Sequence, residues 1–164
     1  MRRTNIVRDK ILEYYSGDPL RSQHLIKVEA FATLIAEKEQ VDEDTATVIS
    51  LLGYCHDIGI KLAEQKYGKS TGKLQEELGK IPSKQLVLDC GFDEIIANRV
   101  SYVTAHHHTY TKIDNIEYQI LVEADFIVNI LENKIDKKKA LTIRNKIFKT
   151  KSGKTLLSQM YALN

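Results

Sequence analysis

Apolar residues along the chain recur every three or four positions, the spacing that places them on one face of an α-helix. Among residues 19–38, for example, Val28, Phe31, Ala32 and Ile35 form such a stripe. The same spacing predicts helices over residues 3–15, 19–38, 42–57, 61–67, 74–81, 83–90, 93–109, 115–133, 136–149 and 152–163. Strictly alternating segments are few, and 2 prolines and 8 glycines are too few for a loop-rich β fold. The pattern therefore predicts an all-α fold.

Two of the predicted helices carry ionisable side chains on their apolar faces. His24 lies on the stripe of the second predicted helix. In the helix over residues 115–133, the inward stripe contains Asp125 and ends at either Leu131 or Glu132. An unpaired carboxyl group is costly to bury, so Asp125 needs a partner inside the protein.

The length and composition of the chain are those of an ordinary globular protein. Its 164 residues predict a single domain over residues 1–164, with 43% hydrophobic and 28% charged residues. The net charge is +2, from 24 basic and 22 acidic residues, which gives no electrostatic reason to expect a nucleic-acid or membrane partner. The run Lys137-Lys138-Lys139 is interpreted as a solvated helix face.

The sequence also predicts a cytoplasmic protein. It has no apolar run long enough to span a bilayer, and its basic N-terminus is not followed by the apolar segment of a signal peptide. Two cysteines, Cys55 and Cys90, do not make a disulfide framework, and both are interpreted as free thiols in a reducing compartment.

The central feature of the sequence is the pair His56-Asp57, which follows an apolar run and precedes Ile58-Gly59. Adjacent residues of a regular helix point about 100° apart, so they cannot both reach one metal ion from the middle of a helix. At a helix end the backbone can turn, and both side chains can then converge. The dipeptide alone is weak evidence, because it occurs often without any function.

The remaining histidines and Asp125 give this pair possible partners. Each has a structural alternative: His24 in the core with a backbone partner, Asp125 paired with a buried arginine, and His106-His107-His108 as an exposed helix end. Taken together, buried imidazoles and a buried carboxyl group on different helices compensate one another if a divalent cation lies between them. Mixed nitrogen and oxygen ligands suit Mn, Fe, Co, Ni or Zn better than Mg or Ca.

The order of a histidine, a His-Asp pair and a distant aspartate resembles the HD-domain superfamily of metal-dependent phosphohydrolases. The residues that carry the resemblance are His24, His56-Asp57 within Leu51–Gly59, and Asp125 within Glu123-Ala124-Asp125. The stretches Tyr118–Asn129 and Phe148–Lys154 also resemble a bacterial group of small stand-alone HD hydrolases. The resemblance implies an all-α helical bundle with the metal site between core helices. It also implies that His24, His56, Asp57 and Asp125 ligate a divalent metal ion.

Two further features bear on the subfamily. Many members have lysine directly after Asp-Ile-Gly, whereas this chain has Ile60 there and Lys61 one position later, which weakens the case for a phosphate contact by Lys61. Members with two metals use additional histidines before the last aspartate. His106, His107 and His108 lie in that interval, and His107 is favoured as the one that faces the site.

The expected function is therefore a metal-dependent phosphohydrolase that acts on a nucleotide or another small phosphorylated metabolite. Asp57, His107 and Lys61 are the expected catalytic residues: Asp57 as ligand and water-orienting group, His107 as proton donor and Lys61 as phosphate contact. Two alternatives remain, a two-iron oxygenase and a non-catalytic metal- or nucleotide-binding regulatory module. The sequence leaves the substrate, the metal and the oligomeric state open, with a dimer among the possibilities.

Overall fold

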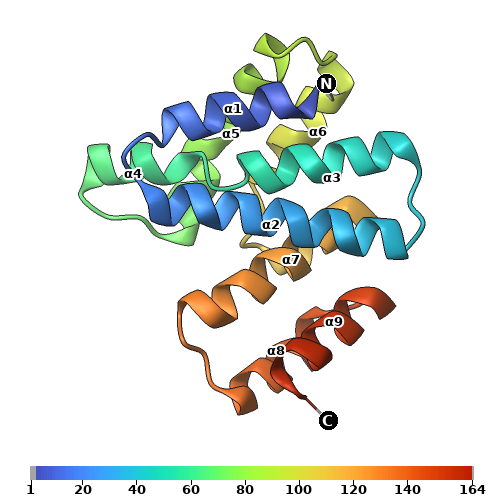
Figure 1. The fold of residues 1–164 in the computed structure, drawn as a ribbon. Coiled ribbons are helices and arrows are strands. Elements are labelled where there is room, and N and C mark those ends of the chain that lie inside the picture. The colour runs from blue at the N-terminus through green and yellow to red at the C-terminus, as the bar shows by residue number, and fades with distance from the viewer. Residues whose placement is uncertain (1–2, 164) are drawn as a thin grey trace.

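The structure is a computed structural model that describes residues 3–163, and within that range it is helical without a strand (Figure 1). This confirms the all-α prediction. The helices are α1 (Thr4–Tyr14), α2 (Pro19–Lys38), α3 (Glu43–Cys55), α4 (Gly59–Tyr67), α5 (Gly72–Asp89), α6 (Glu94–Thr104), the short 3-10 helix η1 (Tyr110–Lys112), α7 (Ile116–Glu132), α8 (Lys137–Ile147) and α9 (Lys151–Tyr161). None of these helices is long and apolar enough to cross a bilayer.

Several helix starts are fixed by side chains that satisfy the free amides of the first turn. The carboxyl group of Asp18 accepts from the amide of Arg21 at 3.1 Å, and Pro19 occupies the first helical position of α2. Asp42 accepts from the amide of Thr45 at 2.9 Å at the start of α3. These local signals set where the site-bearing helices begin.

The structure corrects one prediction about the helices. Residues 74–81 and 83–90 were expected to form two short helices, but they lie in the single helix α5, which contains Pro82. A proline inside a helix removes one backbone hydrogen bond and costs about 3 kcal/mol. Here α5 packs along both α4 and α6, and the hydroxyl of Ser101 in α6 donates to the carbonyl of Lys80 at 2.7 Å. This packing compensates for the proline and keeps the helix continuous.

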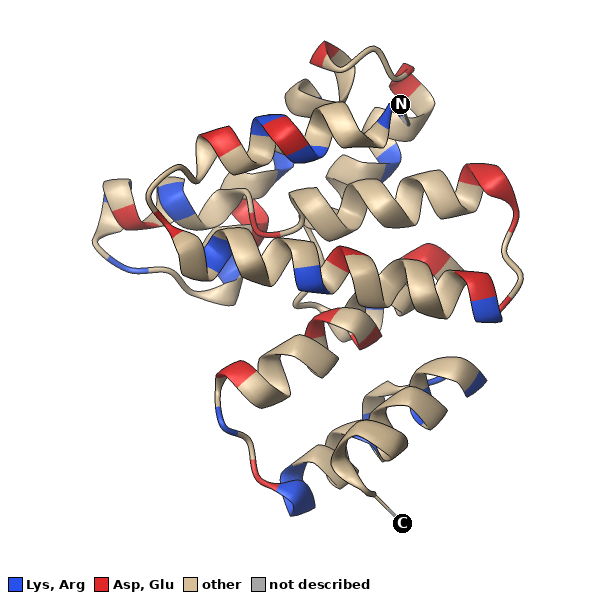
Figure 2. Ribbon diagram, in the orientation of Figure 1, with Lys and Arg blue, Asp and Glu red and all other residues tan. Residues whose placement is uncertain are grey.

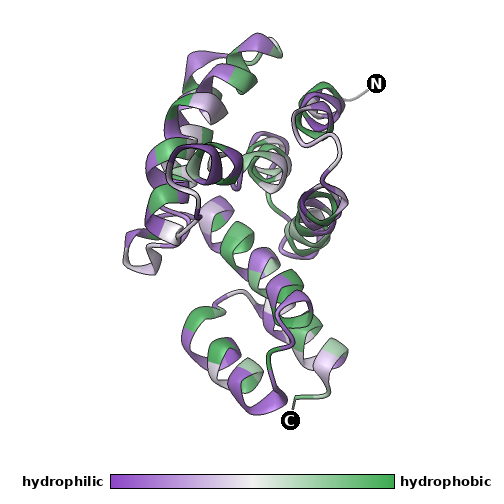
Figure 3. Cartoon of the chain, turned by 90° about the vertical axis from the view of Figure 1, so that its left-hand side faces the viewer, coloured by the Kyte–Doolittle hydropathy of each residue, from purple (hydrophilic) through white to green (hydrophobic). Residues whose placement is uncertain are grey.

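Helix α7 lies at the centre of the molecule. It packs against α2 and α3 on one side and against α9 on the other, so that α1–α6 lie above it and the α8–α9 hairpin lies below it (Figures 1 and 3). Because both sides are covered, most of α7 is buried, including Tyr118, Leu121, Ala124 and Ile127.

Two carboxyl groups of α7 point in opposite directions. Glu123 and Asp125 are two residues apart, which is a rotation of about 200° around the helix axis. Glu123 accepts from the backbone amides of Lys149 at 2.6 Å and Thr150 at 2.9 Å, in the turn between α8 and α9. Asp125 instead faces His24 of α2. The hairpin and the cluster around Asp125 are therefore on opposite sides of α7.

Candidate metal centre

The pair His56-Asp57 lies in the turn between α3 and α4. The helix α3 ends at Cys55, and α4 begins at Gly59. The hydroxyl of Tyr15 donates to the carbonyl of Asp57 at 2.7 Å and holds this turn from the α1 side. A Cβ atom at position 59 would lie 2.5 Å from a backbone carbonyl oxygen of α5, so Gly59 permits the close approach of α4 to α5. The turn directs both side chains of the pair toward α2 and α7.

Three imidazoles and two carboxyl groups converge at this turn. The Nε2 atom of His24 lies 3.2 Å from Oδ1 of Asp125 and 3.4 Å from Oδ2 of Asp57. The Nε2 atom of His56 lies 3.6 and 3.5 Å from the same two oxygens. On the other side of Asp57, Nε2 of His107 lies 3.4 Å from Oδ1. The structure thus brings together the four residues expected to ligate a metal ion, with His107 beside them.

The second ring nitrogen of each imidazole has an acceptor of its own. Nδ1 of His24 lies 2.8 Å from Oε2 of Glu132, and Nδ1 of His107 donates to the carbonyl of Thr104 at 2.8 Å. Nδ1 of His56 lies 3.1 and 3.2 Å from two carbonyl oxygens of α3. Because a carbonyl oxygen can only accept, the proton is on Nδ1 in His56 and His107, and in the neutral ring the lone pair of Nε2 points at the cluster.

This arrangement fits a bound cation. The Nε2 atoms of His24, His56 and His107 are buried and have no hydrogen-bond partner among the described residues. Buried polar atoms without a partner are rare, and these three face carboxyl oxygens at 3.2 to 3.6 Å, at or beyond the upper end of the hydrogen-bond range. A divalent ion between imidazole nitrogens and carboxylates would satisfy both sets of atoms, and this donor set suits Mn, Fe, Co, Ni or Zn.

The electrostatics of the cluster show how strongly these groups interact. Burial lowers the pKa of His24, but Asp125 and Asp57 outweigh it and raise the pKa to about 9. Burial raises the pKa of Asp57, but His56 and His107 outweigh it and lower the pKa to about 2. The pKa of Asp125 is also lowered against burial, by His24 and His56. Both carboxyl groups are therefore ionised at neutral pH, as metal ligands must be.

A second group of three potential ligands shares Asp57 with the first. Ligand atoms of Asp57, His107 and His108 lie within 4.8 Å of one another. Nε2 of His108 lies 2.7 Å from Oε1 of Gln75, which leaves the lone pair of Nδ1 available. Burial and the neighbouring His107 lower the pKa of His108 to about 4, so this ring is neutral near pH 7. The carboxyl group of Asp57 thus lies between two sets of imidazoles.

His106 and Lys61, both considered from the sequence, have partners outside the cluster, and so does Arg99 of α6. Nδ1 of His106 lies 2.7 Å from the carbonyl of Tyr102, and the two rings pack 4.6 Å apart. The ammonium of Lys61 donates to the carbonyl of Tyr14 at 2.7 Å. Arg99 forms ion pairs with two carboxyl groups near the start of α7. His106 belongs to neither group of potential ligands, and a phosphate contact by Lys61, which would require it to leave Tyr14, stays a prediction.

Sequence reasoning missed the role of Glu132. The stripe of α7 was expected to end at either Leu131 or Glu132. Leu131 is 69% exposed, whereas Glu132 is half-buried and bonded to His24. Glu132 lies seven residues after Asp125 and therefore on the same face of α7, which is the signal that could have identified it. Its other oxygen accepts from the ammonium of Lys27 at 2.5 Å, which fixes the carboxyl group against His24.

Replacing Glu132 by alanine is expected to weaken metal binding roughly 10- to 100-fold, because the carboxyl group orients a ligating histidine and raises its basicity. Isothermal titration of metal-stripped protein with Mn or Zn measures this change. Glu132→Gln keeps one acceptor for the ring and should lose less. Glu13→Ala removes an exposed glutamate of α1 and serves as the matched control; equal affinity for Glu132→Ala and this control would show that Glu132 does not act on His24.

Comparison with known proteins gives one informative match. No protein-family profile and no curated protein matches the sequence. The structure is similar to the crystal structure of a predicted HD superfamily hydrolase from an uncultured Thermotogales bacterium. The TM-score is 0.65 at 23% sequence identity, over 98% of this chain and 83% of the other. The chain therefore has the HD-domain fold that its sequence predicts.

Proposed function

We propose that this protein is a metal-dependent phosphohydrolase that cleaves a phosphoester bond of a nucleotide or another small phosphorylated metabolite. The observation that carries the proposal is the set of three buried, unpartnered Nε2 atoms facing the carboxyl groups of Asp57 and Asp125. The HD-domain fold, shared with a protein described as a predicted hydrolase, supports it.

The residues of the cluster would have different roles in binding the ion and in hydrolysis. His24, His56, Asp57 and Asp125 would hold the ion, and Glu132 would fix the ring of His24. A divalent ion bound there would lower the pKa of a coordinated water and polarise a phosphoryl oxygen. Asp57, whose second oxygen faces His107, would orient the attacking water.

His107 has two roles that depend on the number of ions. Burial lowers its pKa, but the carboxyl group of Asp57 outweighs burial and raises it. With one ion bound, His107 would donate a proton from Nε2 to the leaving oxygen of the substrate. With a second ion, His107 and His108 would instead act as its ligands, with Asp57 shared between the two ions.

The second group of ligands also supports one alternative, a two-iron oxygenase. That function requires two irons and consumption of oxygen, whereas hydrolysis cleaves a phosphoester bond with water and consumes no oxygen. Elemental analysis of the purified protein, together with an oxygen electrode, separates the two. A single ion, or two ions without oxygen uptake, would exclude the oxygenase.

The proposal is tested with wild-type protein and Asp125→Ala. We expect the wild type to carry a divalent metal and to hydrolyse at least one member of a panel of nucleoside mono-, di- and triphosphates and dinucleotides, supplied with Mn, Co, Ni, Mg or Fe. Chromatography of the nucleoside and nucleotide products detects cleavage of monoesters, anhydrides and diesters alike. Asp125→Ala should lose activity while circular dichroism shows that the helices remain.

Asp9→Ala is the matched control, because Asp9 is exposed on α1 and its described side-chain contact is with Arg8. It should behave as the wild type. Absence of metal from the wild type, or unchanged hydrolysis by Asp125→Ala, would contradict the proposal.

A further inference from the structure

The small net charge of the chain conceals a strong separation of charge. Residues 1–133 contain 15 basic and 21 acidic residues, a formal charge of −6, whereas residues 134–164 contain nine basic residues and one acidic residue, a formal charge of +8. Figure 2 shows the basic residues along α8 and α9, in contrast to the acidic or mixed charges of the other α-helices. The cations of this basic hairpin face are Lys134, Lys137, Lys138, Lys139, Arg144, Lys146, Lys149, Lys151 and Lys154.

The cations of the basic hairpin face have no carboxyl partners among the described residues. Within residues 3–163 none of the nine cations forms an ion pair. Seven are exposed, and only Arg144 and Lys154 are half-buried. Lys137, Lys138 and Lys139 occupy the first turn of α8, and Lys151 and Lys154 occupy that of α9, where the helix dipole disfavours cations. A partner with many negative charges would compensate this repulsion.

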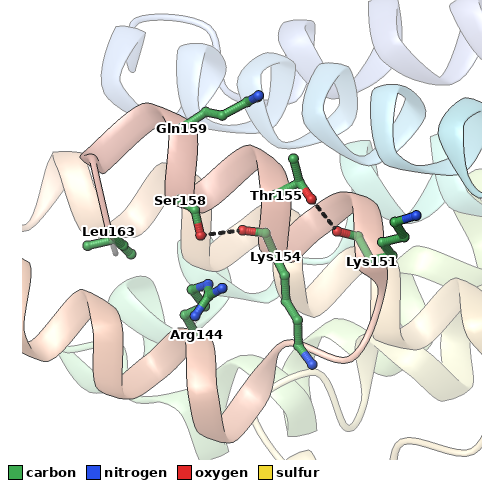
Figure 4. Close-up of a pocket in the computed structure, with 7 residues that line it drawn as sticks. All are labelled: Arg144, Lys151, Lys154, Thr155, Ser158, Gln159 and Leu163. Carbon is green, nitrogen blue, oxygen red and sulfur yellow. Dashed lines mark hydrogen bonds between the residues drawn. The ribbon is translucent and has the colours of Figure 1, made fainter.

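The middle of the face contains a hollow suited to a phosphate group. Arg144 of α8 and Lys151 and Lys154 of α9 line a pocket of about 450 Å³, together with Thr155, Ser158 and Gln159 (Figure 4). No side-chain carboxyl group of residues 3–163 lines it. The buried Nε atom of Arg144 has no hydrogen-bond partner among the described residues. The pocket is thus lined by one arginine and two lysines, the side chains that bind phosphate oxygens in proteins.

The position of this face separates it from the candidate metal centre. The hairpin lies on the side of α7 that carries Glu123, opposite to the side that carries Asp125. The cations therefore do not line the proposed catalytic site. Their distribution over two antiparallel helices, rather than at one point, favours an extended polyanion over a single small phosphate.

Two other kinds of partner fit the face less well. Interfacial membrane helices present large apolar side chains beside their lysines. Among described residues 134–163, Met160 is the one exposed large hydrophobic residue. Phe148 and Leu157 are buried and cannot insert into a membrane. A second copy of the chain would offer residues 1–133, in which the 21 acidic residues are interspersed with 15 basic residues and some are already paired, as Asp18 and Glu64 are with Arg21.

We propose that the basic hairpin face binds the phosphate backbone of a nucleic acid, independently of base sequence. This goes beyond the proposed hydrolase function and departs from the expectation drawn from the overall charge balance. Each phosphate contact releases counterions, so binding must weaken steeply as salt concentration rises. Discrimination between sequences is not expected, because phosphate contacts position a strand without reading its bases.

Fluorescence anisotropy with a labelled single-stranded RNA of mixed sequence, roughly 20 nucleotides long, tests this at KCl concentrations from about 50 to about 200 mM. The full-length protein should bind with a Kd that rises with salt. The triple variant Lys137→Gln/Lys138→Gln/Lys139→Gln should reduce the slope of log K against log salt by about 2, at about 0.7 per phosphate contact. A denaturing gel verifies that the RNA stays intact.

A second triple variant, Arg144→Gln/Lys151→Gln/Lys154→Gln, tests the pocket and should give a similar loss. The matched control Lys10→Gln/Lys66→Gln/Lys80→Gln removes three exposed lysines outside the hairpin and should bind RNA nearly as the wild type. Phosphoester hydrolysis should be the same in all of these proteins, which separates this proposal from that of the hydrolase.

Three results would overturn the proposal: no RNA binding at the lowest salt, an equal loss in the control variant, or binding to phosphatidylserine vesicles without binding to RNA. A further contrary result is a wild type that binds no RNA but self-associates in sedimentation, with the self-association lost in the hairpin variants. That result would also overturn the proposal, because the partner of the face would then be a second copy of the chain.

Discussion

Replacing Asp57 by alanine is expected to remove the bound metal and to lower phosphoester hydrolysis by at least about 10³-fold, because several kcal/mol of transition-state stabilisation are lost. Both oxygens of this side chain are involved. Oδ2 faces His24 and His56, and Oδ1 faces His107, so the substitution affects both groups of potential ligands. No other residue of the cluster contacts all three imidazoles in this way.

Elemental analysis and the chromatographic assay of hydrolysis measure this effect, with circular dichroism to establish that the helices are retained. Asp44→Ala removes an exposed aspartate from the first turn of α3 and is the matched control. If Asp57→Ala kept both its metal and its turnover, the cluster would not be the catalytic centre.

The second large effect is expected on stability. Replacing Glu123 by alanine should lower the free energy of unfolding by at least about 3 kcal/mol, because buried donors lose their acceptor. The carboxyl group of Glu123 is fully buried and accepts from Gln119, from the amides of Lys149 and Thr150, and from the hydroxyl of Thr150. A Cβ atom at position 153 would lie 1.9 Å from it, so Gly153 is required to seat α9 against it.

Urea unfolding followed by circular dichroism measures the change. Glu77→Ala, an exposed glutamate of α5, is the control and should unfold near the wild-type midpoint. An unchanged midpoint for Glu123→Ala would mean that the hairpin does not depend on this contact. Because Glu123 and Asp125 lie on opposite faces of α7, Glu123→Ala in its folded state should still bind metal.

The sequence by itself determined the helical class and the main ligand candidates, because both depend on local patterns. The three- and four-residue spacing of apolar positions specifies helices whatever their packing. It also placed His24 and Asp125 on buried faces, which is where the structure has them. The wrong prediction of two helices in place of α5 has the same origin. A proline such as Pro82 locally favours a helix boundary, whereas the contacts of α5 with α4 and α6 keep the helix continuous.

Tertiary structure alone decided which neighbouring residues share a site. His106, His107 and His108 are equivalent in sequence, yet only His107 and His108 approach Asp57, while His106 turns to Tyr102. The sequence pattern allowed either Leu131 or Glu132 as the end of the inward stripe. The packing of α7 on α2 places Glu132 against His24. Whether Glu123 or Asp125 joins the cluster also depends on which side of α7 faces α2. Distances between segments far apart in sequence are set by packing, which a local pattern does not encode.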